Sequence, residues 1–257
     1  MKRARIENMS SSPKRGGATP GSSNTTLEWT DPAWLEARLQ LLEEEKALSK
    51  AVASLAAKRR SLPWRRVPED YTFVGNGGET TLSQLFGDKV ELIVYHQMMA
   101  EGQESGCSTC AFFIDQWFGS LPHLKPRVAL AIVSKCSWPQ LSKYVRTKEG
   151  WDPSYFYSAG SSTFNEDFQV SFTPEQMKEK ASTYNFNRKW NWGSEAPGLS
   201  VFRKTSEGIM HTYSTFAAGL GGIPSALNLL DLTPSGRLEN GEGGKGNFWW
   251  VKAKEEY

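Results

Sequence analysis

The chain has 257 residues, of which 39% are hydrophobic and 23% charged, and a formal net charge of +2 at pH 7. This composition is typical of a globular protein with a sizeable core, and no apolar stretch approaches the roughly 20 residues that span a bilayer. Its 3 cysteines are too few for the disulfide framework of a secreted domain of this size, so we expect a cytoplasmic protein.

The N-terminus is the only strongly basic part. Residues 1–28 are rich in Ser, Gly, Pro, Lys and Arg, lack the apolar segment of a secretory signal, and are predicted to form a disordered basic tail. The clusters Lys2–Arg5 and Lys14–Arg15 could direct nuclear import, although a solvated tail is the simpler interpretation. The rest of the chain is slightly acidic and gives no reason to expect nucleic-acid binding.

An amphipathic helix is predicted over residues 29–61. Asp31 is placed to cap it, and Pro32 suits its first turn. Apolar residues recur at helical spacing and leave Glu43–Glu45 largely on the other face. Because the apolar residues do not keep a strict heptad, we expect the stripe to dock on its own domain rather than to form a dimer.

Residues 62–257 alternate short apolar strands with helices, the pattern of an α/β domain with a mostly parallel central sheet. The predicted strands are residues 71–74, 90–95, 128–133 and 155–157, followed by an antiparallel hairpin of 199–202 and 209–213 at one edge. The predicted helices are residues 82–86, 111–118, 137–145 and 225–230.

Two cysteines separated by two residues, Cys107 and Cys110, lie between the strand 90–95 and the helix 111–118. A CxxC pair in this setting is typical of a redox dithiol. The free N–H groups and the dipole of a helix N-terminus lower a cysteine pKa and raise the thiolate fraction. We therefore expect Cys107 to attack a substrate disulfide and Cys110 to resolve the mixed disulfide.

A zinc site is the first alternative, since Cys107, Cys110 and His123 have the C-x2-C-x12-H spacing of a zinc finger. No fourth ligand follows His123 at the required distance, and His96, after a strand, is a poor substitute, so we expect no metal. His123 is interpreted as a helix-end or surface residue. Cys136 is interpreted as a small buried hydrophobe, with a third redox thiol as the alternative.

Nine stretches, together with these features, resemble the thioredoxin-like family catalogued as domain of unknown function 899, whose members are described as predicted dithiol–disulfide oxidoreductases. The stretches run from the start of the α/β domain to near the C-terminus: Leu62–Trp64, Leu92–His96, Gly106–Cys110, Leu121–Leu124, Phe164–Phe168, Ser171–Glu175, Pro197–Phe202, His211–Ser214 and Leu230–Pro234. The resemblance implies a thioredoxin-like central sheet with flanking helices, plus the N-terminal helix, and places Cys107 and Cys110 in the redox position.

The same resemblance points to residues around the dithiol. In thioredoxin-like folds a proline before the equivalent of strand 199–202 is usually cis and packs against the CxxC, so Ala196 and Pro197 are expected to bind substrate, with Ser108 and Thr109. An ordinary proline at a strand start explains the spacing of Pro197 equally well. Members often carry Pro or Gly between the cysteines, and Ser108–Thr109 leaves the direction of electron flow open.

The sequence thus predicts a dithiol–disulfide oxidoreductase without a cofactor, acting on a protein or small-molecule disulfide or thiol. A thiol peroxidase remains open, although Ser108 and Thr109 follow Cys107, whereas such an enzyme needs a hydroxyl before its cysteine. A thioredoxin-fold module that binds a partner without redox chemistry remains open as well. No pattern indicates an oligomeric state.

Overall fold

The computed structural model describes residues 31–68, 70–178, 183–186, 188–190, 192–237 and 250–257. The predicted basic tail, residues 1–28, lies outside these ranges. The chain divides into two compact units, Met1–Ala56 and Ala57–Tyr257. Among the described residues, no helix is both long and apolar enough to cross a membrane.

A long helix, α1, runs from Pro32 to Arg60, as the sequence predicts. The side chain of Asp31 accepts a hydrogen bond of 2.8 Å from the backbone N–H of Trp34, so the predicted cap is confirmed. Three basic residues in the last turn, Lys58–Arg60, lie where the negative end of the helix dipole favours them. The docking of the apolar stripe stays a prediction.

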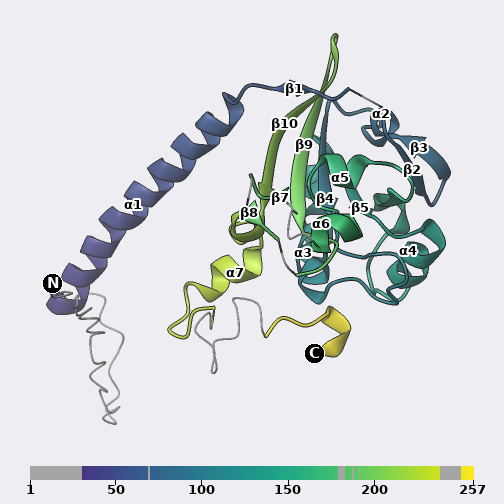
Figure 1. Ribbon diagram of the computed structural model, residues 1–257. Helices are drawn as coiled ribbons and strands as arrows, with labels where there is room; N and C mark the ends of the chain where they lie inside the picture. Colours follow the sequence, from purple (N-terminus) through teal and green to yellow (C-terminus); the bar gives the residue numbers. More distant parts are fainter. Residues whose placement is uncertain (1–30, 69, 179–182, 187, 191, 238–249) are drawn as a thin grey trace, which may run out of the picture. The chain divides into compact units, whose positions relative to one another are not determined.

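The larger unit is built on a mixed eight-stranded sheet, and Figure 1 shows its strands side by side. Three parallel strands form its middle: β4 (Glu91–His96), β5 (Ala129–Ser134) and β6 (Phe156–Ser158). The hairpin of β9 (Gly198–Thr205) and β10 (Gly208–Phe216) pairs antiparallel with the other side of β4. The order β1-β10-β9-β4-β5-β6-β2-β3 is completed by the short strands β1 (Arg65–Arg66), β2 (Thr72–Gly75) and β3 (Gly78–Thr81).

Helices cover both faces of this sheet. On one face lie α3 (Ser108–Leu124) and α4 (Trp138–Val145), and on the other α2 (Leu82–Leu85) and α5 (Phe164–Asp167). Successive strand residues point to opposite faces, so Tyr95 packs with α3 while Val94 packs in the second core. The smaller elements are α6 (Pro174–Lys178), α7 (Ser225–Leu230), the ribbon β7 (Thr183–Tyr184) with β8 (Arg188–Lys189), and the 3-10 turns η1 (Pro153–Tyr155), η2 (Ala217–Leu220) and η3 (Lys254–Glu256).

The chain order of these elements is thioredoxin-like. A strand (β4), a helix opened by the CxxC pair (α3), a parallel strand (β5), a further helix (α4) and a later antiparallel hairpin (β9, β10) follow one another, with α7 after the hairpin. The predicted fold class and its central strands are confirmed. The hairpin is not at the sheet edge, because β1 pairs with β10 and takes that position.

Candidate functional site

Cys107 is the N-cap residue of α3, with the extended backbone typical of that position (φ −63°, ψ 129°). Its carbonyl oxygen accepts the hydrogen bond of the first helical turn from the N–H of Ala111 at 3.0 Å. The loop before it is tied to the end of β4, since the N–H of Cys107 donates to the carbonyl of Met98 at 3.1 Å. The sulfur is thereby held over the positive end of a 17-residue helix.

Hydrogen bonds stabilise the thiolate of Cys107. The side chain of Cys110 contributes most, followed by the backbone N–H groups of Cys110 and Thr109 and the side chain of Thr109. Together these bonds lower the pKa of Cys107 to about 6, although partial burial acts in the opposite direction. A pKa of about 6 favours the thiolate form of the Cys107 side chain at neutral pH.

The pKa of Cys110, one turn into α3, is shifted in the opposite direction to that of Cys107. Cys110 is only 1% exposed, and burial raises the pKa of its thiol well above the ordinary value, with the nearby Cys107 thiolate adding to the effect. The hydroxyl of the buried Tyr95 and the backbone at Met98 also bond to this side chain. Both cysteines are free thiols in the structure. A partly buried thiolate at Cys107 thus lies beside a fully buried, protonated thiol at Cys110.

Gly106 allows the cysteine loop to pass close over the sheet. A Cβ atom at this residue would lie 2.9 Å from Nε2 of Gln97 and 3.0 Å from a ring carbon of Tyr144. A larger residue at this position would therefore force the side chains of Gln97 and Tyr144, or the cysteine loop itself, to shift.

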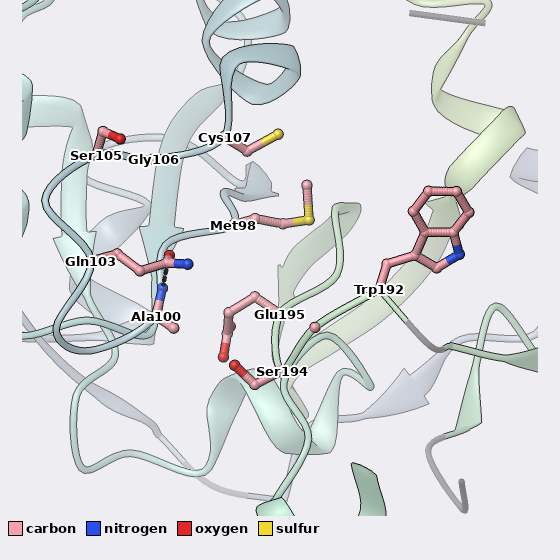
Figure 2. Close-up of a pocket in the computed structure, with 10 residues that line it drawn as sticks. Met98, Ala100, Gln103, Ser105, Gly106, Cys107, Trp192, Ser194 and Glu195 are labelled. Carbon is pink, nitrogen blue, oxygen red and sulfur yellow. Dashed lines mark hydrogen bonds between the residues drawn. The ribbon is translucent and has the colours of Figure 1, made fainter. Parts of the chain in front are cut away.

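The sulfur of Cys107 faces a cavity of about 270 Å³. Figure 2 shows the loop of Met98–Cys107 on one side of it and the loop of Trp192–Glu195 on the other. Trp192 is 87% exposed and forms an apolar rim. A cavity of this size beside an activated thiolate has room for a small disulfide or for the side-chain portion of a larger one.

Glu195 is the one carboxyl group among the ten described residues that line this cavity. Its Oε2 accepts a 2.5 Å hydrogen bond from the hydroxyl of Ser171. Burial raises the pKa of Glu195 to about 7; the Ser171 bond, Lys135 and Asn165 oppose this rise, and Glu166 adds to it. A carboxyl group near its midpoint at physiological pH therefore shares the cavity with Cys107.

The four residues predicted to bind substrate lie next to the cavity and not in its lining. Ser108 is exposed on the first turn of α3, and Thr109 hydrogen-bonds to the Cys107 thiolate and lowers its pKa. Ala196 is buried, and the carbonyl of Pro197 accepts a hydrogen bond from the hydroxyl of Tyr184. Every described peptide bond is trans, so Pro197 fits the alternative interpretation, an ordinary proline at a strand start.

The zinc alternative does not fit the geometry. His123 lies in the last turn of α3, thirteen residues beyond Cys110 and about 20 Å further along the helix. His96 hydrogen-bonds Ser200 at 2.9 Å within the second core, while the dithiol lies in the first. The described residues contain no group of three or more potential metal ligands. Cys136 is fully buried, and burial raises the pKa of its thiol to about 12, as the buried-hydrophobe interpretation requires.

A second cavity, of about 450 Å³, adjoins β10 on the face opposite α3. Phe168, from one of the nine stretches, lines it together with His211, whereas Phe164 is fully buried beneath. A hydrogen-bond chain leads inward from this cavity, from His211 through Ser214 and Ser200 to His96, with heavy-atom distances of 2.7, 2.9 and 2.9 Å.

The sequence alone missed Glu195 and Trp192 as residues of the site. Glu195 immediately precedes the quoted Ala196–Pro197, but nothing local indicates that the carboxyl group is buried. Gly106 before Cys107 was part of a quoted stretch, and its close approach to Tyr144 gives that glycine a physical role.

Comparisons with solved structures show weak overall likeness. Peroxiredoxin Q from Xanthomonas campestris is 14% identical, covers 61% of this chain and 86% of its own, and superposes with a TM-score of 0.39. The yeast mitochondrial 1-Cys peroxiredoxin is 16% identical, covers 66% of this chain and 78% of its own, and superposes with a TM-score of 0.37. BsSco is a member of the Sco family of cytochrome c oxidase assembly proteins. It is 15% identical, covers 60% of this chain and 85% of its own, and superposes with a TM-score of 0.34. At these scores the likeness says nothing of the chemistry of this chain.

A search among curated proteins found no match to the sequence. Residues 25–257, which include α1 and the whole α/β unit, match the family described as "Bacterial protein of unknown function (DUF899)". The match covers the CxxC pair, the cavity beside it and every strand of the sheet, and the chain therefore belongs to that family.

Proposed function

We propose that the protein is a dithiol–disulfide oxidoreductase in which Cys107 attacks and Cys110 resolves. The observation that carries the proposal is the opposite tuning of the two thiols. The pKa of Cys107 is lowered to about 6 at the mouth of a cavity, while Cys110 is 1% exposed and kept protonated by burial. Such a pair has one nucleophile ready at neutral pH and one thiol shielded from other reactions.

The exchange proceeds in two steps. The Cys107 thiolate attacks one sulfur of a substrate disulfide, the sulfur–sulfur bond breaks, and the other sulfur leaves as a thiolate. Cys110 then loses its proton to solvent and attacks Cys107, which releases the second substrate thiolate and leaves a Cys107–Cys110 disulfide. The substrate has gained two electrons and the protein has lost two. An external dithiol must return them before another cycle.

The neighbours of the pair support this division of roles. Once Cys107 is bound in a mixed disulfide it no longer carries the negative charge that helps to hold the proton on Cys110. Loss of that charge lowers the pKa of Cys110, and the Tyr95 hydroxyl remains to stabilise the new thiolate. The resolving thiol is thus activated only after the first step has taken place.

Reduction of insulin disulfides, with dithiothreitol as the electron donor, tests the proposal. We expect turnover by the unaltered protein, none by Cys107→Ser, and at most a single turnover by Cys110→Ser. Cys136→Ser is the matched control and is expected to keep full activity, because its thiol is buried and is not among the described residues that line the cavity. Consumption of hydrogen peroxide without reduction of insulin would instead indicate a thiol peroxidase, and absence of both reactions would indicate a redox-silent binding module.

A further inference from the structure

Apart from the Cys107 thiolate itself, one side chain sets the charge of the Cys107 cavity. Of its ten described lining residues, Glu195 is the only acid and none is basic. Glu101, on the facing loop, is exposed to solvent and is not among the described lining residues; its carboxylate accepts hydrogen bonds from the backbone N–H and hydroxyl of Ser137, at 2.6 and 3.1 Å, at the start of α4.

Lys135, the described cation that acts on Glu195, is already paired with another acid. The ammonium group of Lys135 forms an ion pair of 2.7 Å with Glu166 and also donates to the carbonyl of Ser162 at 2.8 Å. Ser171 and Asn165, the other groups that bond to Glu195, are uncharged. When Glu195 ionises, the cavity therefore gains a negative charge, and Lys135, the described cation that acts on Glu195, is already paired with Glu166.

Glu195 acts on a substrate by charge and not by proton transfer to the nucleophile. In Figure 2 its carboxyl group points away from the Cys107 sulfur, toward Ser194, with Met98 between the two residues. The effect on a bound group is Coulombic, and the partly enclosed cavity screens it less than bulk water does.

We propose that the Cys107 cavity selects small disulfides that are uncharged or cationic, and that Glu195 excludes those bearing carboxylates close to the disulfide. This inference rests on the proposed function. The charged groups of such a substrate lie only a few bonds from its sulfur atoms, so when a sulfur meets Cys107 they must enter the cavity or lie at its mouth. A carboxylate there meets the Glu195 carboxylate, whereas an ammonium group is attracted to it.

Three probes of similar size test the selection. They are cystamine, which carries two ammonium groups, bis(2-hydroxyethyl) disulfide, which is neutral, and 3,3′-dithiodipropionate, which carries two carboxylates. The measurement is the second-order rate of Cys107 mixed-disulfide formation in the Cys110→Ser protein at pH 8.5, where both Cys107 and Glu195 are ionised. Since the probes differ in intrinsic reactivity, the informative quantity is the cystamine-to-dithiodipropionate rate ratio compared between variants.

Adding Glu195→Gln is expected to lower this ratio by about fivefold or more, mainly through faster reaction of dithiodipropionate. The rate with the neutral probe should change little, because glutamine keeps the size of the side chain and its bond to Ser171. Glu79→Gln on β3, at the far edge of the sheet, removes the same charge elsewhere and should leave the ratio unchanged.

A second measurement needs no substitution at Glu195. Lowering the pH from 8.5 to 5.5 protonates Glu195, so the ratio should fall in the protein that retains it and stay constant in Glu195→Gln. An unchanged ratio in both measurements, with all three probes reacting, overturns the selection and leaves the oxidoreductase proposal standing. Failure of all three probes to react with Cys107 overturns the oxidoreductase proposal itself.

Discussion

The hydrogen bond from Cys110 to Cys107 is the largest contribution to the low pKa of the nucleophile. A hydrogen bond to a charged group is worth about 1.5–3 kcal/mol, which corresponds to about 1 to 2 in pKa. Cys110→Ala removes the donor and leaves the helix N-terminus and Thr109 in place. We therefore expect the pKa of Cys107 to rise from about 6 to between about 7 and 8 in this variant.

Cys110→Ser is the matched comparison, since a serine hydroxyl at the same place can still donate. Its Cys107 pKa should stay closer to that of the unaltered protein than to that of Cys110→Ala. The assay is the rate of iodoacetamide alkylation between pH 4 and 10, with the modified residue identified by peptide mass spectrometry. The same midpoint in Cys110→Ala as in the unaltered protein would refute the role of the thiol and assign the low pKa to the helix terminus.

Three further predictions concern the cysteine loop, the buried His96 and the third cysteine. Gly106→Ala should lower the free energy of unfolding by about 1–3 kcal/mol in urea titrations, because its Cβ would crowd Gln97, whereas Gly77→Ala, with open space around it, should change it by less than about 0.5 kcal/mol. His96 has a pKa of about 3 in the folded protein and about 6.5 when unfolded, so the unfolded chain binds more protons between these values, and His96 should contribute a loss of about 3 kcal/mol of stability from pH 7 to pH 4. Because Glu195 and Cys107 titrate in the same range, the measurement is the difference between the pH profiles of the unaltered protein and His96→Asn, and identical profiles would contradict the buried neutral state of His96. Cys136→Ala should leave the rate of insulin reduction within about twofold of the unaltered value, because a thiol with a pKa of about 12 is not a nucleophile at neutral pH.

The parts of the fold with strong local signals are those that the sequence predicts. β4 and β5 are continuous apolar runs because both of their faces are covered by helices, and α3 begins where the CxxC pair indicates. β1 was missed because its two residues, Arg65 and Arg66, are polar and pair with β10 from more than 140 positions away. Strands this short have no periodicity to detect.

The residues of the functional site also fall into those with a local sequence signal and those without one. Cys107 and Cys110 were predicted because their spacing and the helix after them are local properties. Glu195 was not, because its approach to Cys107 depends on the antiparallel pairing of β4 with β9, which brings together residues about a hundred positions apart. The chemistry of a dithiol is visible in its own motif, but the charge of the cavity that it faces is a property of the folded chain.

The central claim is that Cys107 is the attacking thiolate and Cys110 the resolving thiol. Its most direct test is mass spectrometry of Cys110→Ser and Cys107→Ser after each has reacted with the same peptide disulfide at pH 7. We expect a stable mixed disulfide on Cys107 in the first variant and no adduct on the buried Cys110 in the second. An adduct on Cys110 at a comparable rate, or none on Cys107, would contradict it.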